Sequence, residues 1–177
     1  MQRISVIGTT GSGKTTVAKW IAEALGVPHI ELDALHWGPD WEEAPLETFR
    51  GRVSDAIQGG GWVVDGNYGK VRDIVWGRAD TVLWLDYPFL GTFLRLLWRT
   101  LRRIVLRERL WNGNREGLTA VFGRDSILLW AITSHPRYRE EYAQLMSDPE
   151  YAHVRFLRHR SRRETEDWLR SLREEKK

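Results

Sequence analysis

Residues 8–15 have the types and spacing needed to bind phosphate. They read GTTGSGKT and match the pattern G-x-x-x-x-G-K-[ST]. Glycines let successive backbone N–H groups turn toward one anion without clashes of Cβ atoms. Lys14 can reach the β- and γ-phosphates, and the Thr15 hydroxyl can ligate Mg²⁺. We therefore expect a nucleoside triphosphate to bind here, contacted by Gly8, Thr9, Thr10, Gly11, Ser12, Gly13, Lys14 and Thr15.

The segments on either side of this loop have the periodicity that a phosphate loop requires. Residues 3–7 (RISVI) form a short apolar run that predicts a buried strand, and residues 16–25 (TVAKWIAEAL) predict a helix. The positive N-terminal end of that helix would face the same anion as the loop. The context supports a phosphate-binding loop over an ordinary glycine-rich turn.

Apolar strand-like runs alternate with helical periodicity along the rest of the chain. This alternation predicts βαβ units, a parallel sheet and one α/β domain over residues 1–177. Residues 34–45 are expected to be a loop. Strands are expected at residues 3–8, 29–33, 62–65, 81–86 and 153–157, and helices at residues 13–25, 46–58, 69–77, 89–107, 125–146 and 161–174.

Three aspartates follow predicted strands. Because the carboxyl ends of parallel strands meet at one edge, we expect Asp33, Asp65 and Asp86 to lie near the phosphate loop. Asp86 could ligate Mg²⁺, and Asp65 could do so equally well through a metal-bound water. Asp33 could accept a hydroxyl proton or bind an acceptor sugar. The alternative for each is a solvated aspartate that caps the next turn.

An arginine-rich stretch is the second strong signal. At ~100° per residue, six arginines fall within roughly 160° of one helix face. They are Arg95, Arg99, Arg102, Arg103, Arg107 and Arg109, and Arg115 follows in a polar turn. Such a stripe could neutralise charge on a transferred phosphoryl group. The alternatives are a solvated face paired with glutamates and a basic helix on an anionic membrane.

Composition narrows the class of protein. The chain has no cysteine, so thiolate catalysis and cysteine-based zinc sites are excluded, and its histidines lack metal-ligand spacing. No signal pattern or apolar span is present, so we expect a cytoplasmic protein with no membrane partner.

The two halves of the chain differ in charge. Residues 1–89 carry 8 Lys/Arg and 12 Asp/Glu, whereas residues 90–177 carry 19 Lys/Arg and 12 Asp/Glu, which leaves DNA association open. Among the ten tryptophans, Trp37 or Trp41 is expected to line a substrate site.

Taken together, these segments resemble the adenylate-kinase-like group of P-loop kinases and, more narrowly, the small bacterial DNA topology modulation proteins. The matching segments are GTTGSGKTT, IELDALHW, WVVDGNY, ADTVLWLDYP and VRFLRHRSRRETEDWL, beside the arginine-rich helix. The resemblance implies a three-layer P-loop NTPase fold with a five-stranded parallel sheet of order 2-3-1-4-5. It also implies a helical acceptor-binding segment at residues 34–60 and an arginine-bearing lid at residues 107–124.

The resemblance also implies roles for individual residues. Asp33 would face the acceptor, and Asp65 occupies the place of the aspartate in the D-G-[FY]-P motif, near the metal. ATP phosphates and Mg²⁺ would be held by Gly11, Gly13, Lys14, Thr15 and Thr16. Lid arginines such as Arg107 and Arg115, together with Arg103, would close on the phosphates. Arg160 or its neighbours after the fifth strand would border the adenine.

One departure from the family pattern concerns the acceptor. Adenylate kinases continue D-G-F-P-R, whose arginine grips the acceptor phosphate, whereas residues 65–70 here read DGNYGK. The contact of that arginine with the acceptor phosphate is therefore absent here, or it is made by Lys70 or Arg72 instead. We expect a phosphotransferase that uses ATP and Mg²⁺ on a nucleoside, nucleotide or similar metabolite, as a monomer or homodimer. The alternative is an ATP-dependent regulatory protein associated with DNA. Whether Asp33 or Asp65 lies nearer the transferred group stays open.

Overall fold

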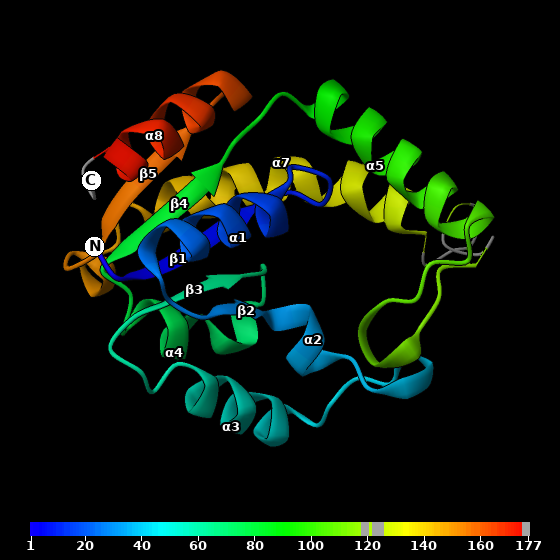
Figure 1. Ribbon diagram of the computed structural model, residues 1–177, viewed down its shortest axis with the longest axis horizontal. Helices are drawn as coiled ribbons and strands as arrows, with labels where there is room; N and C mark the ends of the chain where they lie inside the picture. The colour runs from blue at the N-terminus through cyan, green and yellow to red at the C-terminus, as the bar shows by residue number, and fades with distance from the viewer. Residues whose placement is uncertain (118–120, 122–125, 175–177) are drawn as a thin grey trace.

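A five-stranded parallel sheet forms the centre of the computed structural model, which describes residues 1–117, 121 and 126–174 (Figure 1). The strand order β2-β3-β1-β4-β5 confirms the predicted α/β fold and its topology. The strands are β1 (Arg3–Gly8), β2 (His29–Glu31), β3 (Trp62–Asp65), β4 (Thr81–Leu85) and β5 (Arg155–His159).

Helices cover both faces of the sheet. The longer ones are α1 (Lys14–Leu25), α3 (Leu46–Ala56), α5 (Phe89–Val105), α7 (Ile127–Leu145) and α8 (Arg162–Glu174). The short ones are α2 (Leu32–His36), α4 (Arg72–Trp76) and the 3-10 turns η1 (Pro39–Trp41), η2 (Gly69–Val71), η3 (Trp111–Gly113) and η4 (Pro149–Tyr151). None of the helices within the described ranges is long and apolar enough to cross a bilayer.

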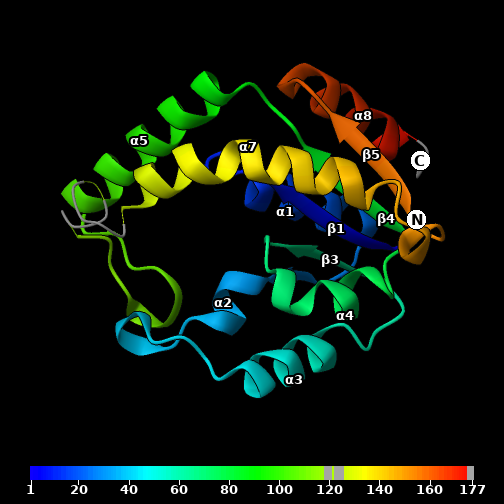
Figure 2. The same cartoon turned by 180° about the vertical axis from the view of Figure 1, so that it is seen from behind.

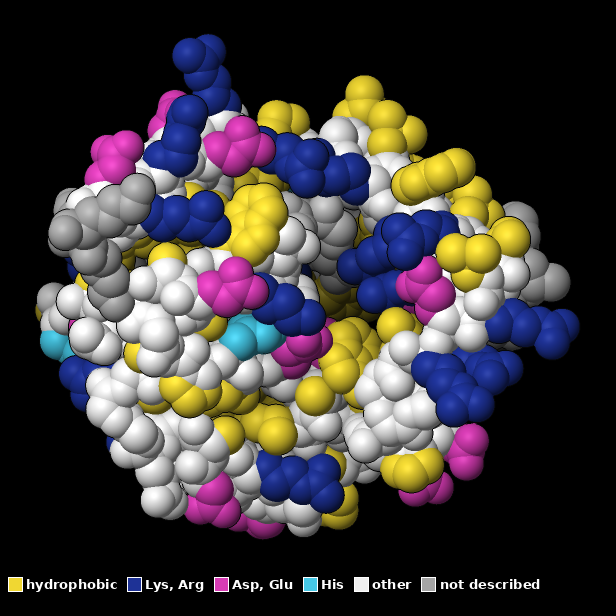
Figure 3. Space-filling view, in the orientation of Figure 1, with side chains coloured by type: hydrophobic (Ala, Val, Ile, Leu, Met, Phe, Trp, Pro, Cys, Tyr) yellow, Lys and Arg dark blue, Asp and Glu magenta, His cyan; other side chains and the backbone are white. Residues whose placement is uncertain are grey.

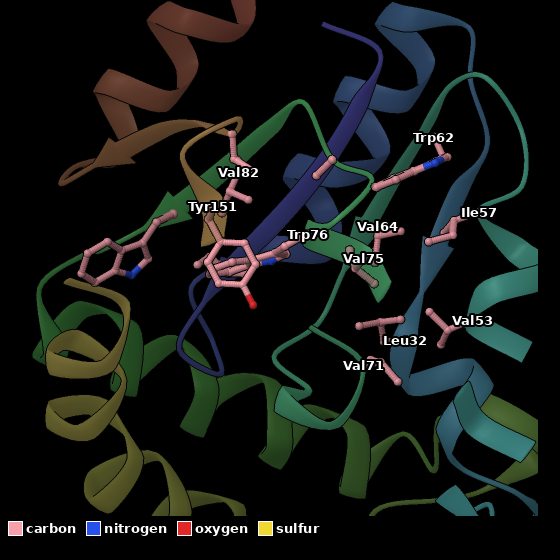
Figure 4. Close-up of a cluster of buried hydrophobic side chains, with 14 of the residues drawn as sticks. Leu32, Val53, Ile57, Trp62, Val64, Val71, Val75, Trp76, Val82 and Tyr151 are labelled. Atoms are coloured by element: carbon pink, nitrogen blue, oxygen red, sulfur yellow. The ribbon is translucent and has the colours of Figure 1, made fainter. Parts of the chain in front are cut away.

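The core has two parts because each face of the sheet buries its own set of side chains. On one face, Ile4 and Val6 of β1 pack with helices α1 and α8. On the other face, Trp62 and Val64 of β3 pack with side chains of α3, α4 and α7, as the close-up in Figure 4 shows for part of the cluster. Burial on both faces explains why β3 and β4 are uninterrupted apolar runs rather than alternating ones.

The structure corrects several predicted boundaries. The strand predicted at residues 29–33 ends at Glu31, because its partner β3 ends at Asp65, the residue paired with Glu31. Helix α2 begins at Leu32, so Asp33 lies in a helix rather than at a strand end, and the loop predicted for residues 34–45 contains most of α2 and all of η1.

Two further boundaries move near the C-terminal half. The fifth strand begins two residues later than predicted, since Arg155–His159 is the segment in register with Thr81–Leu85 of β4. The arginine-rich helix ends at Val105 rather than at residue 107, where the backbone turns to a φ of 49°. Of the lid expected at residues 107–124, residues 118–120 and 122–124 lie outside the described part.

Figures 1 and 2 show that two segments outside the sheet approach each other: α5 with the chain that follows it, and α2 with the chain that follows it. Helix α5 and the segment after it extend away from the sheet, and the turn η3 returns to the region of α2 and η1. The chain thereby encloses a cleft above the carboxyl ends of the strands.

Candidate functional site

The cleft has a volume of about 2240 Å³ and contains most of the residues expected to do chemistry. We call its two sides the phosphate wall and the acceptor wall. Figure 3 shows the hollow, with Lys and Arg side chains gathered on the side toward α5. The phosphate wall consists of Thr10, Gly11, Gly13, Lys14, Thr15, Thr16, Arg95, Arg99 and Arg103. The acceptor wall consists of Glu31, Asp33, His36, Trp37, Trp41, Glu43, Tyr68, Lys70 and Trp111.

The phosphate loop has the backbone shape that its motif predicted. Gly11 and Gly13 have φ angles of 85° and 94°, a region that favours glycine. A Cβ atom at Gly11 would lie 2.6 Å from the Thr92 carbonyl oxygen of α5 and 2.9 Å from Leu96 Cβ. Only a glycine allows α5 to pack this closely on the loop.

Lys14 rests on the loop that it follows. Its Nζ donates to the carbonyl oxygens of Gly8 at 2.8 Å and Thr9 at 3.3 Å. Burial lowers the pKa of the Lys14 ammonium, and the nearby carboxylates of Asp65 and Asp33 oppose this shift. Among the described residues, the Lys14 ammonium is hydrogen-bonded to neutral carbonyls, and it would gain from an anionic partner such as a nucleotide phosphate.

Asn67 joins the ends of β1 and β3 beside the loop. Its Nδ2 donates to the Gly8 carbonyl oxygen at 2.5 Å, and the Gly8 N–H donates to its Oδ1 at 3.2 Å. Asn67 had no predicted role beyond its place in DGNYGK. Its position directly after Asp65 and Gly66 at the end of a strand was the available signal.

Asp65 connects the loop to β2. Its Oδ1 accepts from the Thr15 hydroxyl at 3.1 Å, and its Oδ2 lies 2.6 Å from His29 Nε2. The hydroxyl and carboxylate oxygens of this pair fit Mg²⁺, which prefers oxygen ligands. Within the described ranges, no group of three or more His, Asp or Glu residues could hold a metal alone, so nucleotide phosphates would have to complete the site.

Asp86 has a different environment from Asp65. It is buried, with its Oδ1 2.8 Å from Arg139 Nε and its Oδ2 2.6 Å from Arg158 Nη2. It is not among the residues that line the cleft. The metal role stays a prediction for Asp86, and the visible role of its carboxylate is to join β4 to α7 and β5.

Asp33 faces the cleft from α2 and is held by Tyr68. The Tyr68 hydroxyl donates to Asp33 Oδ1 at 2.5 Å. Burial raises the pKa of the Asp33 carboxyl, although the Tyr68 hydrogen bond and the Lys14 charge act in the opposite direction. Burial also raises the pKa of Tyr68, so this hydroxyl stays protonated and remains a donor. Tyr68 was not among the predicted site residues, and its place in the segment DGNY was the available sequence signal.

The arginine stripe separates into different environments. Arg95 and Arg103 line the cleft, and each has a protein partner: Arg95 Nε donates to the Gly11 carbonyl oxygen at 3.2 Å, and Arg103 Nη1 lies 2.8 Å from Glu116 Oε1. Arg109 and Arg115 also line the cleft, whereas Arg107 is exposed outside it.

Arg99 differs from Arg95 and Arg103 in its hydrogen bonding. It lines the cleft, and its buried Nε has no hydrogen-bond partner among the described residues. Burial lowers the pKa of its guanidinium, and the Arg103 charge adds to this effect. Arg99 belongs to the predicted stripe but was not among the arginines expected to be catalytic, because periodicity does not show which arginine lacks a partner.

Arg160, expected to border the adenine, lies apart from the cleft. It is exposed, and its backbone N–H donates to Glu164 Oε2 at 2.7 Å. It does not line the cleft. Its contact with a nucleotide base therefore stays a prediction.

The acceptor wall is mainly aromatic. The His36 ring lies with its centroid 4.8 Å from Trp37 and 4.6 Å from Tyr68, and Trp37 lies 5.7 Å from Trp41. Both tryptophans singled out from the sequence line the cleft.

The turn after α5 is fastened to the acceptor wall. Asn114 is buried, and its side chain accepts from the Trp41 N–H at 3.1 Å and donates to the Gly38 carbonyl oxygen at 2.8 Å. The Trp111 indole N–H donates to Glu31 Oε2 at 2.9 Å, and the Trp41 indole N–H donates to the Arg115 carbonyl oxygen at 3.2 Å. The described part of the expected lid therefore contacts the acceptor segment.

Comparisons with known proteins agree with this geometry. The sequence profile of the AAA family, ATPases associated with various cellular activities, matches residues 4–86. A shikimate kinase from Persephonella marina (strain DSM 14350 / EX-H1) is 30% identical over 115 residues, covering 54% of this chain and 67% of the relative.

Similar folds occur in solved structures of several kinases. A shikimate kinase from Bacteroides thetaiotaomicron has a TM-score of 0.54 at 19% identity, covering 98% of this chain and 96% of that one. A gluconokinase from Sinorhizobium meliloti 1021 has a TM-score of 0.51 at 20% identity (98% and 94% covered). A deoxyadenosine kinase from M. mycoides has a TM-score of 0.55 at 14% identity (97% and 98% covered). These likenesses establish the fold that the three kinases and this chain share.

Proposed function

Since the chain belongs to the P-loop kinase family that includes shikimate kinase, we propose that it transfers the γ-phosphoryl group of Mg-ATP to a small-molecule hydroxyl, in a nucleoside, nucleotide or similar metabolite. The observation that carries the proposal is the arrangement of the cleft. A phosphate loop with Lys14 against its carbonyl oxygens forms one wall, and the half-buried Asp33, whose carboxyl pKa is raised by burial, forms the other.

The reaction is an in-line displacement. The acceptor hydroxyl oxygen forms a bond to the γ-phosphorus, the bond from that phosphorus to the β–γ bridging oxygen breaks, and ADP leaves. The hydroxyl proton passes to Asp33 and then to water. The raised pKa brings Asp33 closer to the range in which a carboxylate can accept a proton at neutral pH. Tyr68 holds one carboxylate oxygen, which orients the other toward the acceptor.

Residues of the phosphate wall would hold the nucleotide and stabilise developing charge. Backbone N–H groups of residues 8–16 would surround the phosphates, and Lys14 would exchange its loop carbonyls for phosphate oxygens. Arg99 would neutralise the transferred group, because its buried Nε has no hydrogen-bond partner among the described residues. Arg103, Arg107 and Arg115 remain candidates for the same task.

Magnesium fits the Thr15–Asp65 pair. When bound, the ion would neutralise phosphate charge and orient the β- and γ-oxygens. Thr15 Oγ1 would be a direct ligand, and Asp65 would act through a metal-bound water. His29, 2.6 Å from Asp65, keeps that carboxylate oriented.

The narrower resemblance to DNA topology modulation proteins and the association with DNA stay predictions. Three arginines that could have formed a basic outer surface, Arg95, Arg99 and Arg103, line the cleft instead. This placement favours the transferase over the DNA-associated alternative. DNA binding by the protein would weaken steeply with salt if the alternative held.

The test measures ADP formation from Mg-ATP in the presence of nucleosides, nucleotides and polyols. We expect acceptor-dependent ADP with the wild type and none with Lys14→Ala. Arg163→Ala is the matched control, because Arg163 is an exposed cation on α8, away from the cleft. A wild-type protein that binds ATP but forms no phosphorylated acceptor would overturn the proposal.

A further inference from the structure

The acceptor wall carries cations only as partners of its own glutamates. Lys70 Nζ lies 3.8 Å from Glu43 Oε2, and Lys19, which also lines the cleft, has its Nζ 3.2 Å from Glu31 Oε1. Asp33 has no ion pair with a cation within the described ranges, so the wall keeps one unmatched carboxylate. A wall of this charge repels phosphate and carboxylate groups.

The arginines that could grip an anionic acceptor from the side of α3 and α4 are already held. Arg50 makes two hydrogen bonds to the Asp73 carboxylate, at 3.0 and 2.7 Å. Arg52 Nη1 donates to the Leu35 carbonyl oxygen at 3.0 Å, and Arg72 is paired with Glu141. Releasing one of them would leave its partner unpaired, which costs free energy.

Arg99, whose buried Nε has no hydrogen-bond partner among the described residues, belongs to the phosphate side. Burial is the main cause of the lowered Lys14 pKa, and the Arg99 charge adds to it. The Asp33 charge in turn opposes the lowering of the Arg99 pKa, as expected for a group at the junction of the two walls. Arg109 and Arg115 line the cleft but are exposed, and ion pairs of exposed arginines contribute little.

The rings of the acceptor wall are held in fixed orientations. The indole N–H groups of Trp41 and Trp111 are bonded to Arg115 and Glu31 respectively. Aromatic faces fixed in this way favour flat or ring-shaped ligands, which stack with little loss of conformational freedom.

His36 offers a hydrogen bond without a charge. It is 4% exposed, it lines the cleft, and its Nδ1 has no hydrogen-bond partner among the described residues. Burial lowers the pKa of the imidazole, so the ring is neutral at neutral pH. A neutral imidazole can bond a hydroxyl or a ring nitrogen of the acceptor.

We infer that the acceptor is an uncharged, nucleoside-like ring compound that presents a hydroxyl to Asp33 and carries neither phosphate nor carboxylate. This inference rests on the proposed function. It excludes nucleoside monophosphates and sugar acids as preferred acceptors.

The test compares matched pairs that differ by one anionic group. The pairs are each common nucleoside with its 5′-monophosphate, and methyl shikimate with shikimate. We measure kcat/KM with Mg-ATP, and in parallel the Kd of each compound for the protein loaded with a non-hydrolysable ATP analogue. We expect the uncharged nucleoside to exceed its monophosphate by at least about tenfold in both quantities. Equal or better use of the monophosphate overturns the inference.

Failure of the inference can be told apart from failure of the proposed function. If no compound is phosphorylated but a nucleoside binds more tightly than its monophosphate, the acceptor wall is assigned correctly and the transfer is not. If neither member of any pair binds, the inference is wrong.

Two pairs of variants locate the effect in the acceptor wall. Glu43→Arg adds a cation there and is expected to shift preference toward the monophosphate by about tenfold, whereas Glu47→Arg on the exposed side of α3 leaves it unchanged. Trp37→Leu is expected to weaken nucleoside binding, whereas Trp20→Leu, an exposed tryptophan on α1 outside the cleft, does not. An unchanged preference in Glu43→Arg contradicts the inference.

Discussion

The two walls of the cleft are built from different kinds of groups. The phosphate wall has backbone N–H groups, positive φ at glycines and the cations Lys14 and Arg99. The acceptor wall has aromatic rings, the half-buried Asp33 carboxylate and a neutral histidine. Under the proposed function, phosphate would be recognised mainly by charge, whereas the acceptor would be recognised by shape and by single hydrogen bonds. Substitutions in the two walls should therefore alter different kinetic quantities.

The largest effect is expected from Asp33→Asn in the acceptor wall. Loss of the proton acceptor should lower kcat by roughly 10²- to 10⁴-fold while the Kd for ATP stays unchanged. A matched change, Asp40→Asn on the exposed turn η1, should leave kcat unaltered. Turnover of Asp33→Asn at the wild-type rate would show that another group accepts the proton.

The same variant has a distinct stability profile. Because the pKa of Asp33 is raised in the folded state, its contribution to stability is fully present below the ordinary pKa of 3.8 and is lost as pH rises through the folded value. Asp33→Asn should therefore gain Tm relative to the wild type on going from acid to neutral pH. A difference in Tm that is constant with pH would contradict the shift.

The next largest effect is expected from Arg99→Ala in the phosphate wall. Removal of the unpartnered cation should lower kcat by roughly 10²-fold, since one preorganised group that stabilises developing charge contributes about this much. Its control is Arg102→Ala, an exposed arginine of the same helix that pairs with Glu108. Equal losses in both variants would indicate a general effect of α5 rather than a role for Arg99.

A smaller effect is expected at the contact between the turn after α5 and the acceptor wall. Asn114→Ala removes two partly buried hydrogen bonds, to the Trp41 N–H and the Gly38 carbonyl, which should lower the free energy of unfolding by about 1–3 kcal/mol. The acceptor KM should rise several-fold while the KM for ATP stays unchanged, because the two hydrogen bonds of the Asn114 side chain hold the acceptor wall in place. Asn112→Asp tests the neighbouring bond to the Trp37 carbonyl. An equal rise in both KM values would contradict the division into two walls.

The smallest effect concerns His36. Its pKa is lowered in the folded state, so the stability it contributes is present above its ordinary pKa of 6.5 and is lost as pH falls below that value. The Tm of the wild type should therefore fall more than that of His36→Gln between pH 7.5 and 5.5. Parallel curves for the two proteins would show that His36 does not titrate in this way.

The phosphate wall could be predicted from the sequence because its chemistry depends on backbone shape. Residues 8–15 determine that shape almost alone, and Lys14 follows from the same short motif. The order of the sheet followed from the resemblance, and the apolar runs gave β1 and β3 with their exact bounds and β4 with an end one residue too late.

The acceptor wall could not be predicted to the same depth because long-range contacts build it. Tyr68 reaches Asp33 from 35 residues away, and Asn114 reaches Trp41 from 73 residues away. Asp86 has the same place in its strand pattern as Asp65, yet two arginines on other elements partner it. Periodicity likewise placed Arg99 and Arg102 on one face without showing that Arg99 lines the cleft and Arg102 does not.

The most direct measurement is ³¹P NMR of the protein with Mg-ATP and the nucleoside that binds most tightly. Our account predicts equal amounts of ADP and a new phosphomonoester, neither of which forms with Lys14→Ala. ADP accompanied only by inorganic phosphate would show that water, not an acceptor held by Asp33, receives the phosphoryl group. That result would contradict the claim that the two walls meet at a site of transfer.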